Sequence, residues 1–94
     1  MAIQIKLKKE KFQELVAKTG LSFAKIEREI LRRYDVEISA MTLRIYCGRT
    51  KHETYSPHIE KLAILSTYFS EVLDERVEIN DFFELEITPH KRYE

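Results

Sequence analysis

The side chains best suited to act as nucleophiles or metal ligands are one cysteine and three histidines. Cys47 is the single cysteine, and His52, His58 and His90 are dispersed along the chain. Metal sites need several nitrogen or sulfur ligands at short spacings, which this arrangement lacks. Cys47 and His52 could form a nucleophilic pair, but a cysteine just before a glycine is more often a small packing residue. We therefore expect solvated histidines, no metal site and no catalytic residue.

The sequence also lacks a glycine-rich phosphate loop, a paired-carboxylate signature and a serine elbow. One cysteine cannot form an internal disulfide, and no apolar N-terminal stretch resembles a signal peptide or a membrane span. We expect a cytoplasmic, non-enzymatic protein without a cofactor or membrane contact. Its 94 residues correspond to one domain, residues 1–94.

Charge is divided unevenly between the two halves of the chain. Residues 1–51 hold twelve Lys and Arg and six Asp and Glu, net +6, whereas residues 52–94 hold four and ten, net −6. Such asymmetry indicates contact between the basic half and a nucleic acid. The alternative is that the two halves attract each other within the fold.

Both ends of the chain alternate apolar and polar residues, the period of two typical of a half-buried β-strand. The runs are "AIQIKLK", within residues 1–8, and "FELEIT", which predicts a strand over 84–88 and leaves 89–94 as a tail. Lysines on one polar face and glutamates on the other favour antiparallel pairing. Because a two-stranded ribbon is marginal in water, it should pack on helices or continue across a dimer.

Helical periodicity fills the region between these runs. A first helix is predicted over 9–18, ending at Gly20, and a second begins at the N-cap Ser22. The inward stripe of the second helix consists of Phe23, Ile26, Ile30 and Tyr34, with Leu31 flanking it. Its opposite face carries Lys25, Arg28, Glu29 and Arg32.

A later helix starts at Ser56-Pro57, a cap followed by proline at the first helical position. Its wide apolar surface, which begins at Ile59, predicts the central helix of a small bundle. Beyond it, Asn80 or Asp81 could cap a short turn through residues 82–83. The C-terminal strand competes for the same residues.

The order of these pieces resembles the phage-repressor-like (Xre/Cro-type) helix-turn-helix family. The similarity covers roughly residues 9–83 and implies a recognition helix at about 39–47, followed by a basic loop and a proline-led helix. The matching features are Ser39, Thr42, Tyr46, Gly48, Arg49 and Pro57.

Two departures from the family pattern lie before the recognition helix. Ser22 and Ser39 are farther apart than the corresponding caps of the family, which would lengthen the second helix by ~1.5 turns. The turn "YDVEI" also lacks the family's usual glycine.

The resemblance implies which residues meet DNA. Recognition helices read bases through their N-terminal residues, while basic side chains hold phosphates on either side. The base-reading group is Ser39, Ala40, Met41, Thr42 and Arg44, with Arg44 suited to a bidentate contact with guanine. The phosphate contacts are Lys25, Arg28, Arg32, Arg49 and Lys51.

Two alternatives for the recognition segment stay open. Either Met41 with Ile45, or Leu43 with Tyr46 and Cys47, faces the core. A strand over 42–47 also fits the apolar spacing.

We expect a mainly α fold, a four- to five-helix bundle with a helix-turn-helix and a pair of short terminal strands. The expected function is sequence-specific binding of double-stranded DNA by a repressor-type regulator, acting as a homodimer. The terminal strands or the Phe82-Phe83 region would pair the two copies. The alternatives are an antitoxin-like module that binds a protein partner, and single-stranded RNA binding through exposed tyrosines.

Overall fold

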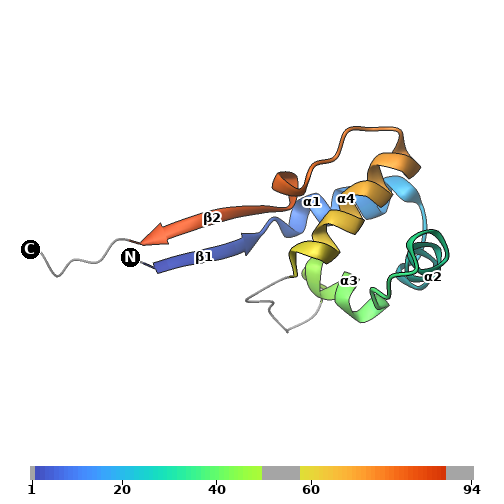
Figure 1. Ribbon diagram of the computed structural model, residues 1–94, viewed down its shortest axis with the longest axis horizontal. Helices are drawn as coiled ribbons and strands as arrows, with labels where there is room; N and C mark the ends of the chain where they lie inside the picture. The colour runs from blue at the N-terminus through green and yellow to red at the C-terminus, as the bar shows by residue number, and fades with distance from the viewer. Residues whose placement is uncertain (1, 50–57, 89–94) are drawn as a thin grey trace, which may run out of the picture.

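The computed structural model describes residues 2–49 and 58–88, with side chains for 6–49 and 58–85. The described chain forms four α-helices, one short 3-10 helix and a two-stranded antiparallel sheet, so the predicted fold class is confirmed. Figure 1 shows the helices gathered into one body from which both strands project. In chain order the elements are β1 (Ala2–Leu7), α1 (Lys9–Thr19), α2 (Phe23–Tyr34), α3 (Ala40–Tyr46), α4 (Ile59–Leu73), η1 (Ile79–Phe82) and β2 (Phe83–Thr88).

Local backbone signals set the ends of the first three helices. α1 ends at Gly20, whose φ of 69° lies in the left-handed region that glycine adopts without a Cβ clash. The Ser22 hydroxyl caps α2 by accepting a hydrogen bond from the N–H of Lys25 at 3.2 Å. Ser39 caps α3 in the same way, with the N–H of Thr42 at 3.1 Å. These boundaries confirm the predictions based on one glycine and two serines.

α4 supplies much of the core, as its wide apolar surface predicted. Its buried residues are Leu62, Leu65, Ser66, Tyr68 and Phe69. Its first residue, Ile59, is 56% exposed and does not belong to the buried stripe. The predicted start at Ser56-Pro57 lies outside the described residues. None of the helices within 2–49 and 58–88 combines the length and the apolar character that crossing a membrane requires.

Aromatic rings join the first helix to the C-terminal end of the body. Phe12 of α1 and Phe82 of η1 stack with their centroids 4.5 Å apart, and Phe82 meets Phe69 edge-on at 6.4 Å. Tyr46 of α3 lies 5.4 Å from Phe12. Such pairs contribute ~0.5–1.5 kcal/mol beyond their burial. This aromatic cluster of Phe12, Tyr46, Phe69 and Phe82 therefore ties four elements together.

The 3-10 helix η1 settles how the residues before β2 are arranged. Its N-cap is Glu78, whose side chain accepts from the backbone of Asp81, while Asp81 accepts from the N–H of Glu78 at 2.9 Å. The cap is therefore Glu78, and neither Asn80 nor Asp81 takes that role. η1 directs the side chain of Phe82 toward the aromatic cluster, where it is fully buried. The prediction that Phe82 helps to pair two copies is wrong for this reason.

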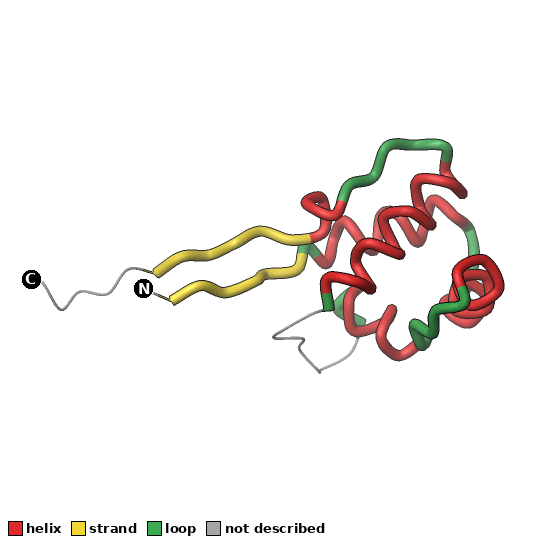
Figure 2. Tube along the Cα trace, viewed as in Figure 1, coloured by secondary structure: helices red, strands yellow, loops and turns green. Residues whose placement is uncertain are grey.

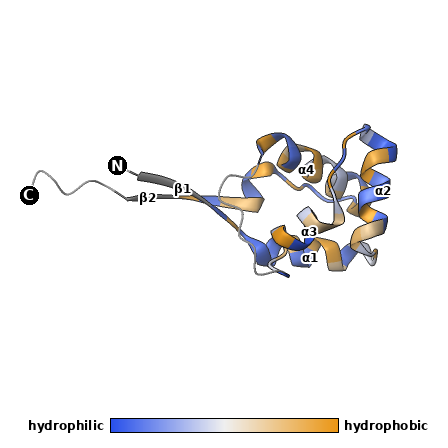
Figure 3. Cartoon of the chain, turned by 90° about the horizontal axis from the view of Figure 1, so that it is seen from below, coloured by the Kyte–Doolittle hydropathy of each residue, from blue (hydrophilic) through white to orange (hydrophobic). Residues whose placement is uncertain are grey.

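The two strands form the predicted antiparallel ribbon, with Lys6 opposite Glu84. The N–H of Lys8 donates to the carbonyl of Phe82 at 2.7 Å, so hydrogen bonding continues to the base of the ribbon. Figure 2 and the perpendicular view of Figure 3 both show the ribbon extending away from the helices. Of the two expected ways to stabilise it, packing on the helical body is found at the base of the ribbon, where Leu7 and Phe83 pack partly against the core.

Candidate nucleic-acid interface

The recognition segment is helical, as α3, so the alternative of a strand there is wrong. Leu43, Tyr46 and Cys47 are buried, whereas Met41 is 51% exposed and Arg44 is exposed. Of the two rotations, the one that turns Leu43 and Tyr46 toward the core is therefore correct. The outward side of α3 presents Met41 and Arg44.

Most polar groups at the start of α3 bond to one another. The hydroxyls of Ser39 and Thr42 lie 3.0 Å apart, in addition to the capping bond. Glu27 of α2 accepts a hydrogen bond from the N–H of Ala40 at 2.9 Å. This N–H would otherwise lack a partner within the helix, and a negative charge is favourable at a helix N-terminus. Of the predicted base-reading group, Met41 and Arg44 thus extend outward, while Ser39 and Thr42 form the cap.

The guanidinium of Arg44 lies over the ring of Phe23, with Cζ 5.7 Å from the ring centroid. Phe23 is the first residue of α2, so the charge of Arg44 is held between α3 and the start of α2. Cation–π contacts at exposed sites are worth ~0.5–1 kcal/mol. That is enough to bias the position of Arg44 and too little to prevent it from moving to a ligand.

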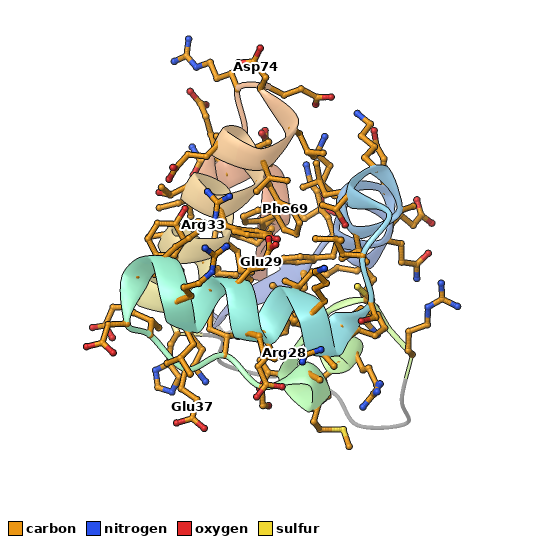
Figure 4. The ribbon with its side chains drawn as sticks, turned by 90° about the vertical axis from the view of Figure 1, so that its right-hand side faces the viewer. Arg28, Glu29, Arg33, Glu37, Phe69 and Asp74 are labelled. Atoms are coloured by element: carbon orange, nitrogen blue, oxygen red, sulfur yellow. The ribbon has the colours of Figure 1, made fainter. Side chains whose placement is uncertain are left out.

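The outer face of α2 carries a row of three cations. Lys25, Arg28 and Arg32 are all exposed, as predicted from their helical spacing. Figure 4 looks onto this helix and shows Arg28 at its edge next to α3. Arg28 is therefore the member of this row that lies beside the recognition helix.

Two predicted positions on α2 are wrong. Glu29 was expected on the outward face, beside the cations. It instead faces α4 and accepts a hydrogen bond from the hydroxyl of Tyr68 at 2.6 Å (Figure 4). The Arg33 guanidinium lies 5.7 Å from the centroid of the same ring. Leu31, expected beside the buried stripe, is 48% exposed. The orientation of α2 allows the buried hydroxyl of Tyr68 to bond to the carboxylate of Glu29. A periodic sequence pattern does not show such a contact.

The cations of the predicted site make no ion pair with any carboxylate of residues 6–49 and 58–85. The ion pairs found there use other basic residues and lie along α1, at the end of α2 and beyond α4. They join Lys11 and Lys18 to Glu14, Lys18 to Glu75, Arg33 to Glu71, and Arg76 to Glu78. The predicted site cations that take part in none of these ion pairs are Lys25, Arg28, Arg32, Arg44 and Arg49. Lys51 lies outside the described residues.

The connection between α2 and α3 differs from the prediction. α2 has 12 residues and ends at Tyr34, and residues 35–39 form a non-helical link before α3. Asp35 occupies a left-handed position at φ 55° in the turn that was noted to lack a glycine. Asp35 is tolerated there because short polar side chains enter this region at modest cost.

A hollow of about 320 Å³ lies between α1, the start of α2 and the end of α3. Arg44 and Arg49 lie on its wall, together with the apolar Val16, Leu21 and Phe23. Nothing in the sequence pattern indicates this hollow, because its wall combines residues 13–24 with residues 44–49, two segments that are distant along the chain.

Cys47 also lines the hollow but is 1% exposed. Burial raises the pKa of its thiol to about 11, against the lowering effect of Arg49. The thiol is therefore protonated at neutral pH, whereas a cysteine nucleophile must be a thiolate. His58 is exposed, while His52 and His90 lie outside the described residues. No group of three metal-ligating side chains occurs in the part of the chain that the structure describes.

Two contributors to the site escaped the sequence analysis. Glu27 was not recognised as the partner of Ala40, and Phe23 was assigned only to the core stripe. Both act across a turn whose geometry the sequence does not state. The one available signal was the position of Glu27 one turn into α2, on the side that meets the next helix. Comparison with protein-family models, with curated proteins and with solved structures found no match.

Proposed function

We propose that this chain binds double-stranded DNA as a sequence-specific, repressor-type regulator that inserts α3 into the major groove. The observation that carries the proposal is a set of cations on α2, on α3 and just beyond α3 that make no ion pair with a carboxylate of residues 6–49 and 58–85. Cations without such a partner are available to phosphates. Their clustering around one exposed, capped helix is what a groove-reading module requires.

Within this proposal the outward residues of α3 read bases. Arg44 donates two hydrogen bonds to guanine, a contact worth ~1–3 kcal/mol of discrimination. Met41 offers an apolar contact to a thymine methyl group. Ser39, Ala40 and Thr42 hold the N-terminus of the helix near the bases.

The surrounding cations hold the backbone. Lys25, Arg28 and Arg32 on α2, and Arg49 and Lys51 after α3, would neutralise phosphates. Each neutralised phosphate releases counterions, so log K falls with log salt at a slope of about −0.9 per contact. The proposal therefore requires binding that weakens steeply with salt.

The proposal places the chain in the cytoplasm, with access to DNA, and assigns it binding without catalysis or a cofactor. One short α3 offers few base contacts. Two copies on a two-fold symmetric site would double them, so we propose a homodimer.

The test compares the Arg44→Ala and Arg28→Ala variants on duplexes selected by the wild-type protein from a randomised pool. Arg44→Ala should weaken binding to the selected duplex by about 5- to 150-fold and relax discrimination at one base pair per half-site. Arg28→Ala should weaken binding to all duplexes equally and reduce the salt slope by about 1. Arg76→Ala, at a cation paired with Glu78, is the matched control and should bind as wild type. Failure of the wild-type protein to select any duplex would refute the proposal.

A protein partner is the second candidate, favoured by Glu27 and by exposed apolar residues. Glu27 places a carboxylate at the end of α3 that would approach DNA, and Met41 and Leu31 are each about half exposed. Retention on heparin that falls steeply with salt supports DNA binding. Passage through heparin, together with specific co-purification of a basic protein, supports this alternative.

A further inference from the structure

The hollow between α1, the start of α2 and the end of α3 has a largely apolar wall. Its volume of about 320 Å³ lies at the lower end of the range found for ligand-binding pockets. Val16, Leu21 and Phe23 line it and are partly buried. Ala17 and Ala24, which are exposed, also line it. The hollow is therefore open to solvent, although its wall offers water few hydrogen bonds.

The charged groups on this wall are all positive. No Asp or Glu is among the described residues that line the hollow. Of the uncharged polar side chains there, Gln13 donates a hydrogen bond to the carbonyl of Cys47, and the hydroxyl of Ser22 caps α2. Arg44 and Arg49 remain, and a guanidinium has donors but no acceptor. A ligand that matches this wall has an anionic acceptor at one end and an apolar body.

Local backbone geometry holds the two arginines at the hollow. α3 ends in a Schellman motif, in which Gly48 takes the left-handed position at φ 71°. The N–H of Gly48 donates to the carbonyl of Ile45 at 3.0 Å, and the N–H of Arg49 donates to the carbonyl of Arg44 at 2.8 Å. The Arg44 guanidinium also lies over the ring of Phe23, which is part of the wall. The fold therefore positions two cations at one apolar hollow.

We propose that this hollow binds a small monocarboxylate with an unbranched apolar chain, and that Arg44 and Arg49 hold its carboxylate. A carboxylate accepts two parallel hydrogen bonds from a guanidinium, so both its charge and its shape match the arginines. Inorganic phosphate matches the charge but leaves the apolar wall facing water. An uncharged apolar molecule covers that wall but makes no use of the guanidinium donors. The wall therefore selects a ligand that combines both features.

The volume of the hollow limits the length of the chain. A water-sized group occupies ~30 Å³ in a liquid, so the hollow holds roughly ten non-hydrogen atoms. Octanoate has this size. Small ligands bind weakly to a site that is open to solvent, and we expect a dissociation constant of about 1 mM. The proposed ligand class is therefore a medium-chain carboxylate.

A carboxylate bound here would compete with DNA for Arg44. This consequence rests on the proposed function, in which Arg44 donates to guanine. The bound carboxylate would occupy the same donors and bring a negative charge to the surface that faces the duplex. The ligand would therefore release the protein from DNA. The carboxylate site itself depends only on the hollow and its two arginines.

The first test titrates the isotope-labelled protein, without DNA, with octanoate, octanol or acetate at constant ionic strength. Octanoate should shift the amide signals of residues that line the hollow, such as Leu21 and Phe23, in a saturable way. Acetate lacks the chain and octanol lacks the charge, so each should bind at least about tenfold more weakly. Failure of octanoate to approach saturation by about 20 mM overturns the proposal. Binding of octanol or acetate as tightly as octanoate also overturns it.

Two variants separate the charged part of the wall from the apolar part. Arg44→Ala removes one cation, whereas Ala17→Leu keeps every charge and fills part of the hollow at an exposed helical position that tolerates leucine. Each should weaken octanoate binding by at least about fivefold. Arg28→Ala is the matched control, because Arg28 is exposed and is not among the described residues that line the hollow. Octanoate should bind this control as tightly as wild type, and equal losses in Arg28→Ala and Arg44→Ala would overturn the site.

The second test adds octanoate to the complex with the duplex selected by the wild-type protein. At about ten times its dissociation constant, octanoate should weaken duplex binding about tenfold, whereas acetate at the same concentration should leave it unchanged. A protein saturated with octanoate that binds the duplex as tightly as before overturns the competition. If the wild-type protein selects no duplex, the proposed function and the competition fail, and the octanoate titration still decides the carboxylate site.

Discussion

The helical body and the ribbon are stabilised in different ways. In the body, fourteen buried apolar residues form one core. Among the described side chains, every buried polar atom there has a hydrogen-bond partner. The ribbon has backbone pairing and favourable cross-strand partners, yet Leu85 remains 57% exposed. The body therefore supplies most of the folding free energy of the monomer, and the described part of the ribbon adds little buried apolar surface.

The largest expected difference follows from removing one apolar side chain from each region. Phe82→Ala should lower the free energy of unfolding by about 3–5 kcal/mol, because it empties the aromatic cluster between Phe12 and Phe69. Leu85→Ala should change it by less than about 0.5 kcal/mol at low protein concentration, since more than half of its surface is already exposed in the monomer. Urea denaturation measures both. Similar losses for the two variants would contradict the comparison.

Two tyrosines test the same contrast within the body, with a smaller effect. The Tyr68 hydroxyl is buried and donates to Glu29, so Tyr68→Phe leaves a half-buried carboxylate without its partner. A hydrogen bond to a charged group is worth about 1.5–3 kcal/mol, and we expect a loss in that range. Tyr34→Phe removes an equally short bond to the exposed Glu71 and should cost less than about 1 kcal/mol. Equal costs would show that burial does not set the value of these bonds.

The tyrosines also predict a weaker fold at alkaline pH. Burial, together with the hydrogen bond to Glu71, raises the pKa of Tyr34 to about 12, and burial with Glu29 raises the pKa of Tyr68 as well. Because these phenols ionise more readily in the unfolded chain, near pH 10, their contribution is complete below that pH. It is lost progressively as the pH rises toward 12. Urea denaturation across this range should show the decline, and Tyr34→Phe should make it shallower.

The sequence predicted the parts of the body that depend on local chemistry. Gly20, Ser22 and Ser39 define helix ends through bonds that span only a few residues. The terminal strands followed from alternation and from the opposite charges of Lys6 and Glu84. These features were predictable because the type and spacing of the residues that form each one are enough to identify it.

What the sequence missed depends on contacts between distant segments. Glu29 looked like part of a solvated face, because helical periodicity does not show that Tyr68 of α4 needs an acceptor. Phe82 looked like an exposed apolar residue until η1 placed it against Phe12. In the candidate site, the rotation of α3 stayed open for the same reason. Both of its faces are apolar in part, and only packing chooses between them.

The smallest effect concerns the link between α2 and α3, where the body is not locally optimal. Asp35 has φ 55° and its N–H caps α2 by donating to the carbonyl of Leu31 at 2.9 Å. Glycine keeps this backbone bond and removes the Cβ penalty of the left-handed region, so Asp35→Gly should stabilise the protein by about 0.5–1 kcal/mol. Asp74, at φ 53° after α4, is the matched control and should respond equally. Thermal denaturation distinguishes the outcomes: if only Asp74→Gly stabilises, the Asp35 carboxylate contributes to the turn and the link is built for an aspartate.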